Sequence, residues 1–388
     1  MKVYFDARMI DHPGIGRYIR CLLPIMAEDK SLDLILLGNK EKIKKFLAAG
    51  LNAIDFNYPI YSVQEQIGFL KLKKMINKGQ GKDTDYILHI PHYNIPVLAR
   101  FNLVATIHDL IHILYPEGAK SAFAHLYMKF MISRVLKSAG SIICVSQATK
   151  NLMEGNGKAV VIYEGVDKTF TKITDIAYLK SVREKYKLPD KFLLYVGSIR
   201  RHKNIKTLLD SFGHFKKRVP DMNLVIVGRH SQPIDLGKEG VIYLGELASD
   251  AELAAIYNLA SCLFNLSLYE GFGLTILEAQ ACGLPVICSD IPAHREVGGK
   301  GILPVKASYI DQICENLYNI LFNNELRDTL ISHGFENAKK FEWNFTAKNT
   351  IEIYRKTLNE SSDSSRLASG DAGRRKNPQC FLQNISSG

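Results

Sequence analysis

The sequence predicts an α/β protein built from two doubly wound parallel sheets. Short apolar runs alternate with helical patterns along the 388 residues. Many of these runs are apolar at successive positions, which is typical of strands that helices cover on both faces of a parallel sheet. The alternation pauses over residues 167–189, and a new apolar run begins at Phe192. Two separate sheets are therefore expected.

Each predicted strand is a short run rich in Val, Ile, Leu and Phe. In the first sheet we expect strands at residues 3–5, 34–37, 87–88, 104–107, 141–145 and 160–162. In the second we expect strands at residues 192–196, 224–227, 262–266 and 286–288. Helical periodicity between them predicts, among others, helices at residues 18–26 and 274–281.

The pause divides the chain into two domains, each long enough to bury its own core. We expect an N-terminal domain over residues 1–169 and a C-terminal domain over residues 170–345. A helix over residues 346–358 is expected to return to the N-terminal domain. Residues 359–388 are rich in Ser, Gly and Arg and lack periodicity, which predicts a disordered tail.

Composition and charge restrict the class of protein. With 46% hydrophobic and 23% charged residues the chain is an ordinary globular protein, so collagen, coiled coil and wholesale disorder are excluded. The apolar runs are shorter than a membrane-spanning helix needs. Asp6 comes too early for a signal peptide, so a cytoplasmic protein is expected. The net charge of +11 attracts nucleic acid, an anionic membrane surface or phosphorylated ligands.

The most informative segment covers residues 265–287. A buried strand enters a turn that contains Gly271 and Gly273, and the predicted helix 274–281 follows. Glycine lets the backbone approach a ligand closely, and the start of a helix favours an anion. Glu270 stands in the turn and Glu278 in the helix. Because eight helical residues span about 12 Å, the two acids suit an extended ligand with hydroxyls on both sides of a phosphate.

This Glu-x7-Glu segment resembles the donor-binding signature of the retaining GT-B glycosyltransferases of family 4, and the resemblance covers roughly residues 1–358. It implies two Rossmann-like domains that face each other across a cleft, with the acceptor on the N-terminal side. Glu270 would lie by the transferred sugar as a catalytic residue, and Glu278 would hold the ribose hydroxyls. The turn amides at Phe272, Gly273 and Leu274 would contact the sugar and the diphosphate.

A second segment supplies positive charge directly after the strand at residues 192–196. The family pattern Gly-Arg-x5-Lys places Lys203 on the donor diphosphate, where its charge would take part in catalysis. Ser198 stands where the family has its arginine, so the guanidinium role passes to Arg200 or Arg201, and the choice stays open. Leu247 is also assigned to the donor site.

Two segments of the N-terminal domain complete the predicted site. Gly14 and Gly16 form a Gly-x-Gly pattern after the first strand, and in family 4 a glycine-rich loop here faces the donor phosphates. His108 ends another strand, and the resemblance implies that it contacts the transferred sugar as a third catalytic residue. Asp109 is interpreted as a turn or cap residue.

We expect neither a metal ion nor a cofactor beyond the nucleotide-sugar co-substrate. We assign no metal motif, neither an Asp-x-Asp pair nor a His cluster at ligand spacing. The charge of the leaving group would rest on Lys203, the arginines and helix amides. The resemblance implies retention of configuration, with the departing phosphate oxygen taking the proton of the acceptor.

The donor and acceptor are predicted more coarsely. Asp6-x-Arg8, the Gly14 segment and His108-Asp109-Leu110 resemble the bacterial mannosyltransferase-like branch, which favours a hexose transfer from GDP-mannose. UDP-glucose, UDP-N-acetylglucosamine and activated rhamnose or fucose remain alternatives. The acceptor would be a glycan or a lipid-linked saccharide of envelope polysaccharide synthesis. Basic stretches at residues 40–45, 71–74 and 129–137 could dock on the inner face of an anionic membrane.

Three other classes of protein remain as alternatives. A GT-B sugar-nucleotide epimerase would share the fold but isomerise its donor without an acceptor. A nucleic-acid-binding protein would need aromatic residues among clustered basic ones or a recognition helix, and neither is evident. An inactive scaffold is disfavoured because Glu270, Glu278 and Lys203 are all present.

Overall fold

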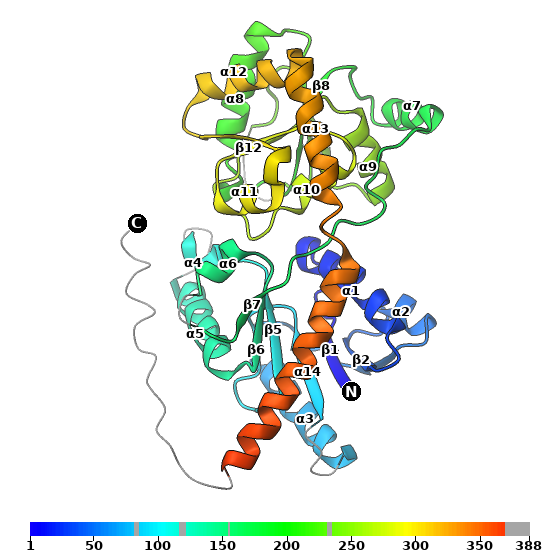
Figure 1. The fold of residues 1–388 in the computed structure, drawn as a ribbon, viewed down its shortest axis with the longest axis vertical. Helices are drawn as coiled ribbons and strands as arrows, with labels where there is room; N and C mark the ends of the chain where they lie inside the picture. Colours follow the sequence, from blue (N-terminus) through cyan, green and yellow to red (C-terminus); the bar gives the residue numbers. More distant parts are fainter. Residues whose placement is uncertain (81–84, 116–121, 154–155, 231–234, 369–388) are drawn as a thin grey trace. The chain divides into compact units, whose positions relative to one another are not determined.

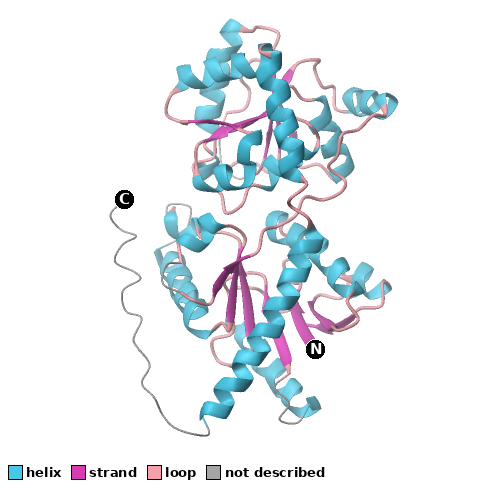
Figure 2. Cartoon of the chain, in the orientation of Figure 1, coloured by secondary structure: helices cyan, strands magenta, loops and turns pink. Residues whose placement is uncertain are grey.

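The computed structural model describes residues 1–80, 85–115, 122–153, 156–230 and 235–368 (Figure 1). The chain divides into two compact units. Unit 1 comprises Met1–Tyr163 together with the chain from Trp343 onward, and unit 2 comprises Glu164–Glu342. Each unit is an α/β structure with its own parallel sheet and its own helices (Figure 2). The predicted fold class is confirmed.

The sheet of unit 1 has the strand order β3-β2-β1-β4-β5-β6-β7, with every neighbouring pair parallel. Its strands are β1 (Lys2–Asp6), β2 (Asp33–Gly38), β3 (Asn52–Asp55), β4 (Tyr86–Ile90), β5 (Leu103–Ile107), β6 (Ser141–Cys144) and β7 (Ala159–Val161). Successive residues of β1 point to opposite faces and are buried from Val3 to Asp6: Val3 and Phe5 enter one core and Tyr4 the other. Burial on both faces explains why these strands are apolar without alternation.

Helices cover both faces of this sheet. The helices of unit 1 are α1 (Pro13–Glu28), α2 (Lys44–Ala48), α3 (Val63–Gln80), α4 (Ile111–Leu114), α5 (Ala122–Ser138), α6 (Gln147–Asn151) and α14 (Trp343–Ala368). α3 and α5 pack on one face through residues such as Phe69 and Met131. α1 and α14 pack on the other through residues such as Leu22 and Tyr354.

The sheet of unit 2 has the strand order β10-β9-β8-β11-β12-β13, again with every neighbouring pair parallel. Its strands are β8 (Phe192–Val196), β9 (Asn223–Val227), β10 (Val241–Gly245), β11 (Cys262–Asn265), β12 (Val286–Ser289) and β13 (Leu303–Val305). Its helices are α7 (Ile176–Lys185), η2 (Arg201–Lys203), α8 (Ile205–Arg218), α9 (Asp250–Leu259), α10 (Leu274–Ala281), α11 (Pro292–Gly298), η3 (Gly299–Gly301), α12 (Ile310–Phe322) and α13 (Asn324–Ala338).

Three strands escaped prediction, and all three lie at sheet edges: β3, β10 and β13. An edge strand has a neighbour on one side only and is less buried, so it needs no continuous apolar run. β3 illustrates this, because both of its end residues are exposed. Among the described strands, the continuous apolar pattern therefore detects the central ones and the edge strand β7, but misses the other edge strands.

The boundaries between the units differ from the predicted ones. The chain enters unit 2 at Glu164, not at residue 170, because Val166 donates a backbone hydrogen bond to Phe341 and Phe170 packs in the unit 2 core. α14 begins at Trp343 rather than residue 346. It stays helical through Ala368, where the sequence predicted a tail from residue 359. The rest of that tail lies outside the described residues.

Candidate functional site

Lys203 and Glu270 meet at the carboxyl edge of the unit 2 sheet. Lys203 ends η2, which follows β8, and Glu270 lies in the turn after β11. β8 and β11 are parallel neighbours, so their following loops emerge side by side. The ammonium Nζ of Lys203 donates to both carboxylate oxygens of Glu270, at 2.6 and 2.7 Å. The two predicted residues, far apart in sequence, thus form one ion pair.

The surroundings keep Glu270 ionised. The side chains of Lys203 and Glu270 are only 18% and 15% exposed. Burial by itself raises the pKa of Glu270, but Lys203, helped by His294 and Ser267, holds that pKa below the usual range of a glutamate. At neutral pH the site therefore contains a carboxylate and an ammonium group in close contact.

The turn after β11 leads directly into α10, whose bounds agree with the helix predicted from the sequence. Gly273 is the N-cap of α10 and has φ = 118°, a conformation that a side chain would strain. The ring of Phe272 is buried and packs edge-on against Phe341, at 5.9 Å between centroids. Hence the predicted contacts at Phe272, Gly273 and Leu274 can come from their backbone amides at the start of a helix.

Glu278 lies on α10 and is almost fully buried, at 3% exposure. Tyr257 of α9 donates its hydroxyl to Oε2 of Glu278 at 2.8 Å. A buried carboxylate needs such donors, because each missing one costs about 1–3 kcal/mol. Tyr257 therefore orients the acid that is predicted to hold the ribose, and the sequence offered no signal for this partner.

We predict that Tyr257→Phe weakens nucleotide binding several-fold and lowers the free energy of unfolding by about 1–3 kcal/mol. The substitution keeps the buried ring and removes the hydroxyl that Glu278 accepts from. Isothermal titration with GDP and with UDP measures the first effect and urea unfolding the second. Tyr178→Phe on α7 is the matched control. A normal nucleotide affinity with reduced stability would mean that Tyr257 has only a structural role.

The other predicted donor residues of unit 2 also follow strand ends. Arg200 and Arg201 are exposed where η2 begins, so both remain candidates for the guanidinium role. The backbone oxygen of Ser198 accepts from Tyr195 at 3.2 Å. Leu247 follows β10 and packs partly against the core that includes α9.

His294 is a site residue that the sequence reasoning missed. It is fully buried on α11, and its Nδ1 lies 2.9 Å from the backbone oxygen of Ser289. The opposite edge of the ring faces the turn, because a Cβ placed on Gly273 would lie 3.8 Å from its Cδ2. Burial lowers the pKa of His294, against the pull of Glu270. Its position just past the carboxyl end of β12 was the available signal.

In unit 1 the structure corrects one expectation. Gly14 and Gly16 lie in the first turn of α1 rather than in a loop. Gly16 is needed for packing, because a Cβ there would come within 2.2 Å of the backbone oxygen of Ile10. No described heavy atom lies within 4 Å of the position that a Cβ on Gly14 would take.

His108 directly follows β5, and its ring packs edge-on against Tyr18 of α1, at 4.9 Å between centroids. The side chain of Asp109 accepts from the backbone N–H of Ile111 at 3.0 Å, which is the turn role expected of it. His108 therefore lies at the carboxyl edge of its sheet, where it was predicted.

No group of three or more His, Cys, Asp or Glu side chains that could hold a metal ion occurs among the described residues. The sequence contains one Asp-x-Asp pattern, Asp83-Thr84-Asp85, which corrects the expectation that there is none; Asp83 and Thr84 lie outside the described residues. None of the described helices combines the length and apolarity needed to cross a membrane.

Comparison with protein families gives two matches. The family described as glycosyl transferases group 1 matches residues 180–337, and the family described as Glycosyltransferase Family 4 matches residues 53–170. O-antigen chain mannosyltransferase B of Escherichia coli is 29% identical over 387 residues, covering 92% of this chain and 100% of that protein. These matches give the epimerase and nucleic-acid-binding alternatives no support.

Solved structures of low identity share the fold. Sucrose-phosphate synthase from Thermosynechococcus elongatus superposes with a TM-score of 0.71 at 20% identity, covering 93% of this chain and 100% of that one. HepE from Anabaena, in complex with UDP-glucose, superposes with a TM-score of 0.68 at 17% identity, covering 94% and 100%. The fold is therefore the GT-B fold.

Proposed function

The chain belongs to the group 1 glycosyltransferases of family 4, and from this premise we propose that it transfers a mannosyl residue from GDP-mannose to a glycan or lipid-linked saccharide of an envelope polysaccharide. The similarity to a bacterial O-antigen mannosyltransferase supports the choice of mannose. The observation that carries the proposal is the Lys203–Glu270 pair beside the start of α10.

The geometry suggests how the chemistry would proceed. The donor diphosphate binds at the turn amides before α10, and Lys203 turns from Glu270 to the phosphates. As the bond between the sugar and the phosphate breaks, its electrons go to the phosphate oxygen, and Lys203 stabilises that charge. Glu270, released from its partner, faces the positive charge that develops on the sugar. For His108 of unit 1 the family resemblance also implies a contact with a sugar.

We propose that the acceptor hydroxyl attacks the face from which the diphosphate leaves. The departing phosphate oxygen takes the hydroxyl proton, so the products are a glycoside of unchanged configuration and a nucleoside diphosphate. No protein base and no resident metal is required in this scheme. NMR of the product tests retention, and assay after dialysis against a chelator tests the role of metal.

A thermal-shift series tests the donor site. We expect GDP-mannose and GDP to raise the unfolding temperature and NAD to have no effect. A ligand at 100 times its Kd adds about 2.7 kcal/mol to the free energy of unfolding. UDP and UDP-glucose serve as comparisons for the nucleobase. Stabilisation by NAD alone would overturn the donor-site assignment. A larger effect of UDP species would make a UDP-sugar, rather than GDP-mannose, the proposed donor.

We further propose that one face of unit 1 docks on an anionic membrane. α3 and α5 cover the same face of the sheet, and both helices carry exposed apolar side chains and lysines: Val63, Ile67, Met75, Lys71 and Lys74 on α3, and Leu126, Phe130, Lys129 and Lys137 on α5. Such a surface matches lipid headgroups in charge and acyl chains in polarity. The basic stretch at residues 40–45 packs through Ile43 on the opposite face, so it is not part of this surface.

Sedimentation with vesicles measures this docking. We expect binding to phosphatidylglycerol vesicles, weaker binding to phosphatidylcholine, and a decrease with added salt. Leu126→Glu combined with Phe130→Glu should reduce binding about tenfold or more, because it inserts charge into the apolar part of the surface. Phe345→Glu is the control, since Phe345 is 57% exposed on α14, which packs on the other face. Equal loss in the control would refute the assigned surface.

A further inference from the structure

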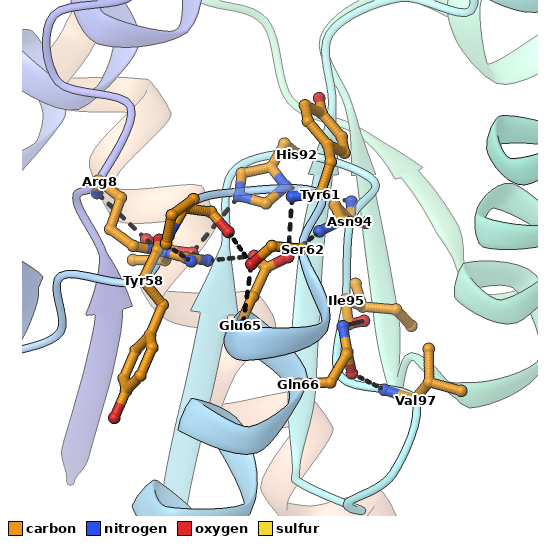
Figure 3. A network of polar contacts seen from close by, with 12 residues as sticks. Arg8, Tyr58, Tyr61, Ser62, Glu65, Gln66, His92, Asn94, Ile95 and Val97 are labelled. Carbon is orange, nitrogen blue, oxygen red and sulfur yellow. Dashed lines mark hydrogen bonds and ion pairs between the residues drawn. The ribbon is translucent and has the colours of Figure 1, made fainter. Parts of the chain in front are cut away.

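A buried polar network lies at the carboxyl edge of the unit 1 sheet, between β1 and β4 (Figure 3). Asp6 ends β1, and His92 follows β4 by two residues. The chain order of the strands reverses between β1 and β4, because β2 and β3 lie on one side of β1 and β4 to β7 on the other. Open α/β sheets bind ligands at such reversal points.

The centre of the network is an ion triad. The Nη2 of Arg8 donates to Asp6 and to Glu65, at 2.6 Å in both cases. Asp6 and Glu65 are fully buried, and the side chain of Arg8 is 5% exposed. Removing three charges from water is costly, and an apolar cluster of equal volume often stabilises a fold as well. The triad is therefore better explained by the geometry that it imposes on its neighbours.

That geometry is the position of two loops and one helix. Arg8 donates to the backbone oxygen of Tyr58 at 3.1 Å, and Glu65 accepts from the backbone N–H of Tyr61 at 3.0 Å. Glu65 also accepts from the side-chain amide of Asn94, which in turn accepts from the hydroxyl of Tyr127 at 2.5 Å. The network thus joins the segment before α3 to the loop after β4 (Figure 3), and the hydroxyl of Tyr127 extends it to α5.

Three tyrosines form the outer side of this assembly. The ring of Tyr61 lies 5.9 Å from that of Tyr93 and 6.5 Å from that of Tyr127, measured between centroids. Tyr61 is 49% exposed, although its backbone has φ = 68°. A left-handed tyrosine is strained, and its half-exposed ring recovers little of that cost by burial. Such strain occurs mainly at ligand clamps and active sites.

We propose that Tyr61, Tyr93 and Tyr127 form a binding subsite for a neutral saccharide, the terminal sugar of the acceptor. This proposal rests on the proposed function for the role of the sugar, but not for the site itself. Tyrosine offers a flat apolar face for the C–H groups of a sugar ring and a hydroxyl for its polar edge. The ionised groups beneath the rings are already paired with one another. Burial chiefly raises the pKa of Tyr93, and the negative charge of nearby Asp109 adds to this shift, so the surroundings of the rings disfavour an anion.

The decisive variant is Tyr61→Gly. Glycine adopts φ = 68° without strain, so the unfolding temperature should stay close to that of the unchanged protein while the ring is lost. Saturation-transfer NMR with methyl α-D-mannopyranoside and the full chain measures binding directly. We expect ring-proton signals with the unchanged protein and at least about tenfold weaker binding in Tyr61→Gly, as for the loss of an aromatic anchor. Tyr127→Phe should cause a smaller loss.

Two controls test whether the NMR signal of the glycoside comes from this subsite. Tyr309→Ala removes an exposed tyrosine of unit 2 and should keep the signal. Lys203→Ala disrupts the candidate donor site and should keep it as well, which separates the subsite from a sugar held by the donor site. Absence of any signal at millimolar glycoside, or undiminished binding in Tyr61→Gly, would overturn the subsite.

The same experiment separates this inference from the proposed function. If sugar nucleotides stabilise the protein but Tyr61→Gly binds the glycoside normally, the subsite fails and the donor assignment stands. If the glycoside binds through Tyr61 but no sugar nucleotide stabilises the protein, the subsite stands and the proposed function fails.

Discussion

Replacing Lys203 with alanine is expected to lower the rate of sugar transfer about a hundred- to a thousandfold. The substitution removes a preorganised positive charge from the leaving diphosphate, and the loss of one such donor usually raises the barrier by about 3–4 kcal/mol. Steady-state kinetics with GDP-mannose measure the effect, which should appear mainly in kcat because the charge develops in the transition state.

Lys206→Ala is the matched control for this prediction. Lys206 lies three residues further along and is exposed on α8, so its loss should leave the rate within about twofold. Lys203→Arg keeps the charge but changes its shape, and should recover only part of the activity. A Lys203→Ala variant with undiminished kcat would remove the ammonium group from the mechanism.

The Lys203→Ala variant should also show an altered dependence of its free energy of unfolding on pH. In the unchanged chain the pKa of Glu270 is lowered, so this carboxylate stabilises the fold above the pKa of an unfolded glutamate. That contribution is lost as the pH falls through the lowered value. Without Lys203, burial dominates and raises the pKa, so ionised Glu270 destabilises the fold at neutral pH. Urea unfolding should therefore show a deficit near pH 7 that shrinks near pH 4.

Replacing Arg8 with methionine is expected to destabilise the protein by about 3–5 kcal/mol, because it leaves Asp6 and Glu65 as unpaired buried charges. In the unchanged protein burial raises the pKa of both acids, and Arg8 counteracts this effect. It keeps the pKa of Asp6 well below its usual range. Calorimetry should show the unfolding temperature of unit 1 lowered by roughly 10 °C.

Arg100→Met is the control for this second prediction, since Arg100 is exposed in the same unit. Adding Asp6→Leu and Glu65→Met to Arg8→Met should restore part of the stability, because no unpaired charge then remains. It should not restore glycoside binding, since the segment of Tyr61 loses its anchor. An Arg8→Met variant as stable as the control would show that the acids find other partners.

Much of the fold could be predicted from local sequence. The helix Leu274–Ala281 agrees to the residue, because a glycine N-cap and a Gly-x-Pro stop mark its ends in the chain itself. The central strands are detectable because burial on both faces demands apolar side chains at every position. Edge strands carry no such demand, and those that were missed, such as Asn52–Asp55, all lie at sheet edges.

The residues of the candidate site also fall into those that a local motif reveals and those that it does not. Glu270, Glu278 and Lys203 could be identified because each stands in a short motif with fixed spacing. Tyr257 and His294 could not, because each contacts the site from another helix and has no motif of its own. Glu65 and Asn94 were missed for the same reason, since Glu65 is distant in the chain both from Arg8 and from Asn94, its partners in the network. Gly14 and Gly16 were placed in a loop although they begin α1.

The sequence alone thus determined the class of fold, the central strands and the residues with charge at the site, since these depend on composition and on neighbours along the chain. Only the tertiary structure decided which side chains hold those residues in place. The pairing of Lys203 with Glu270 follows from the adjacency of β8 and β11, and the triad of Asp6, Arg8 and Glu65 from the packing of α3 beside β1. Such contacts arise from strand order, which no local pattern encodes.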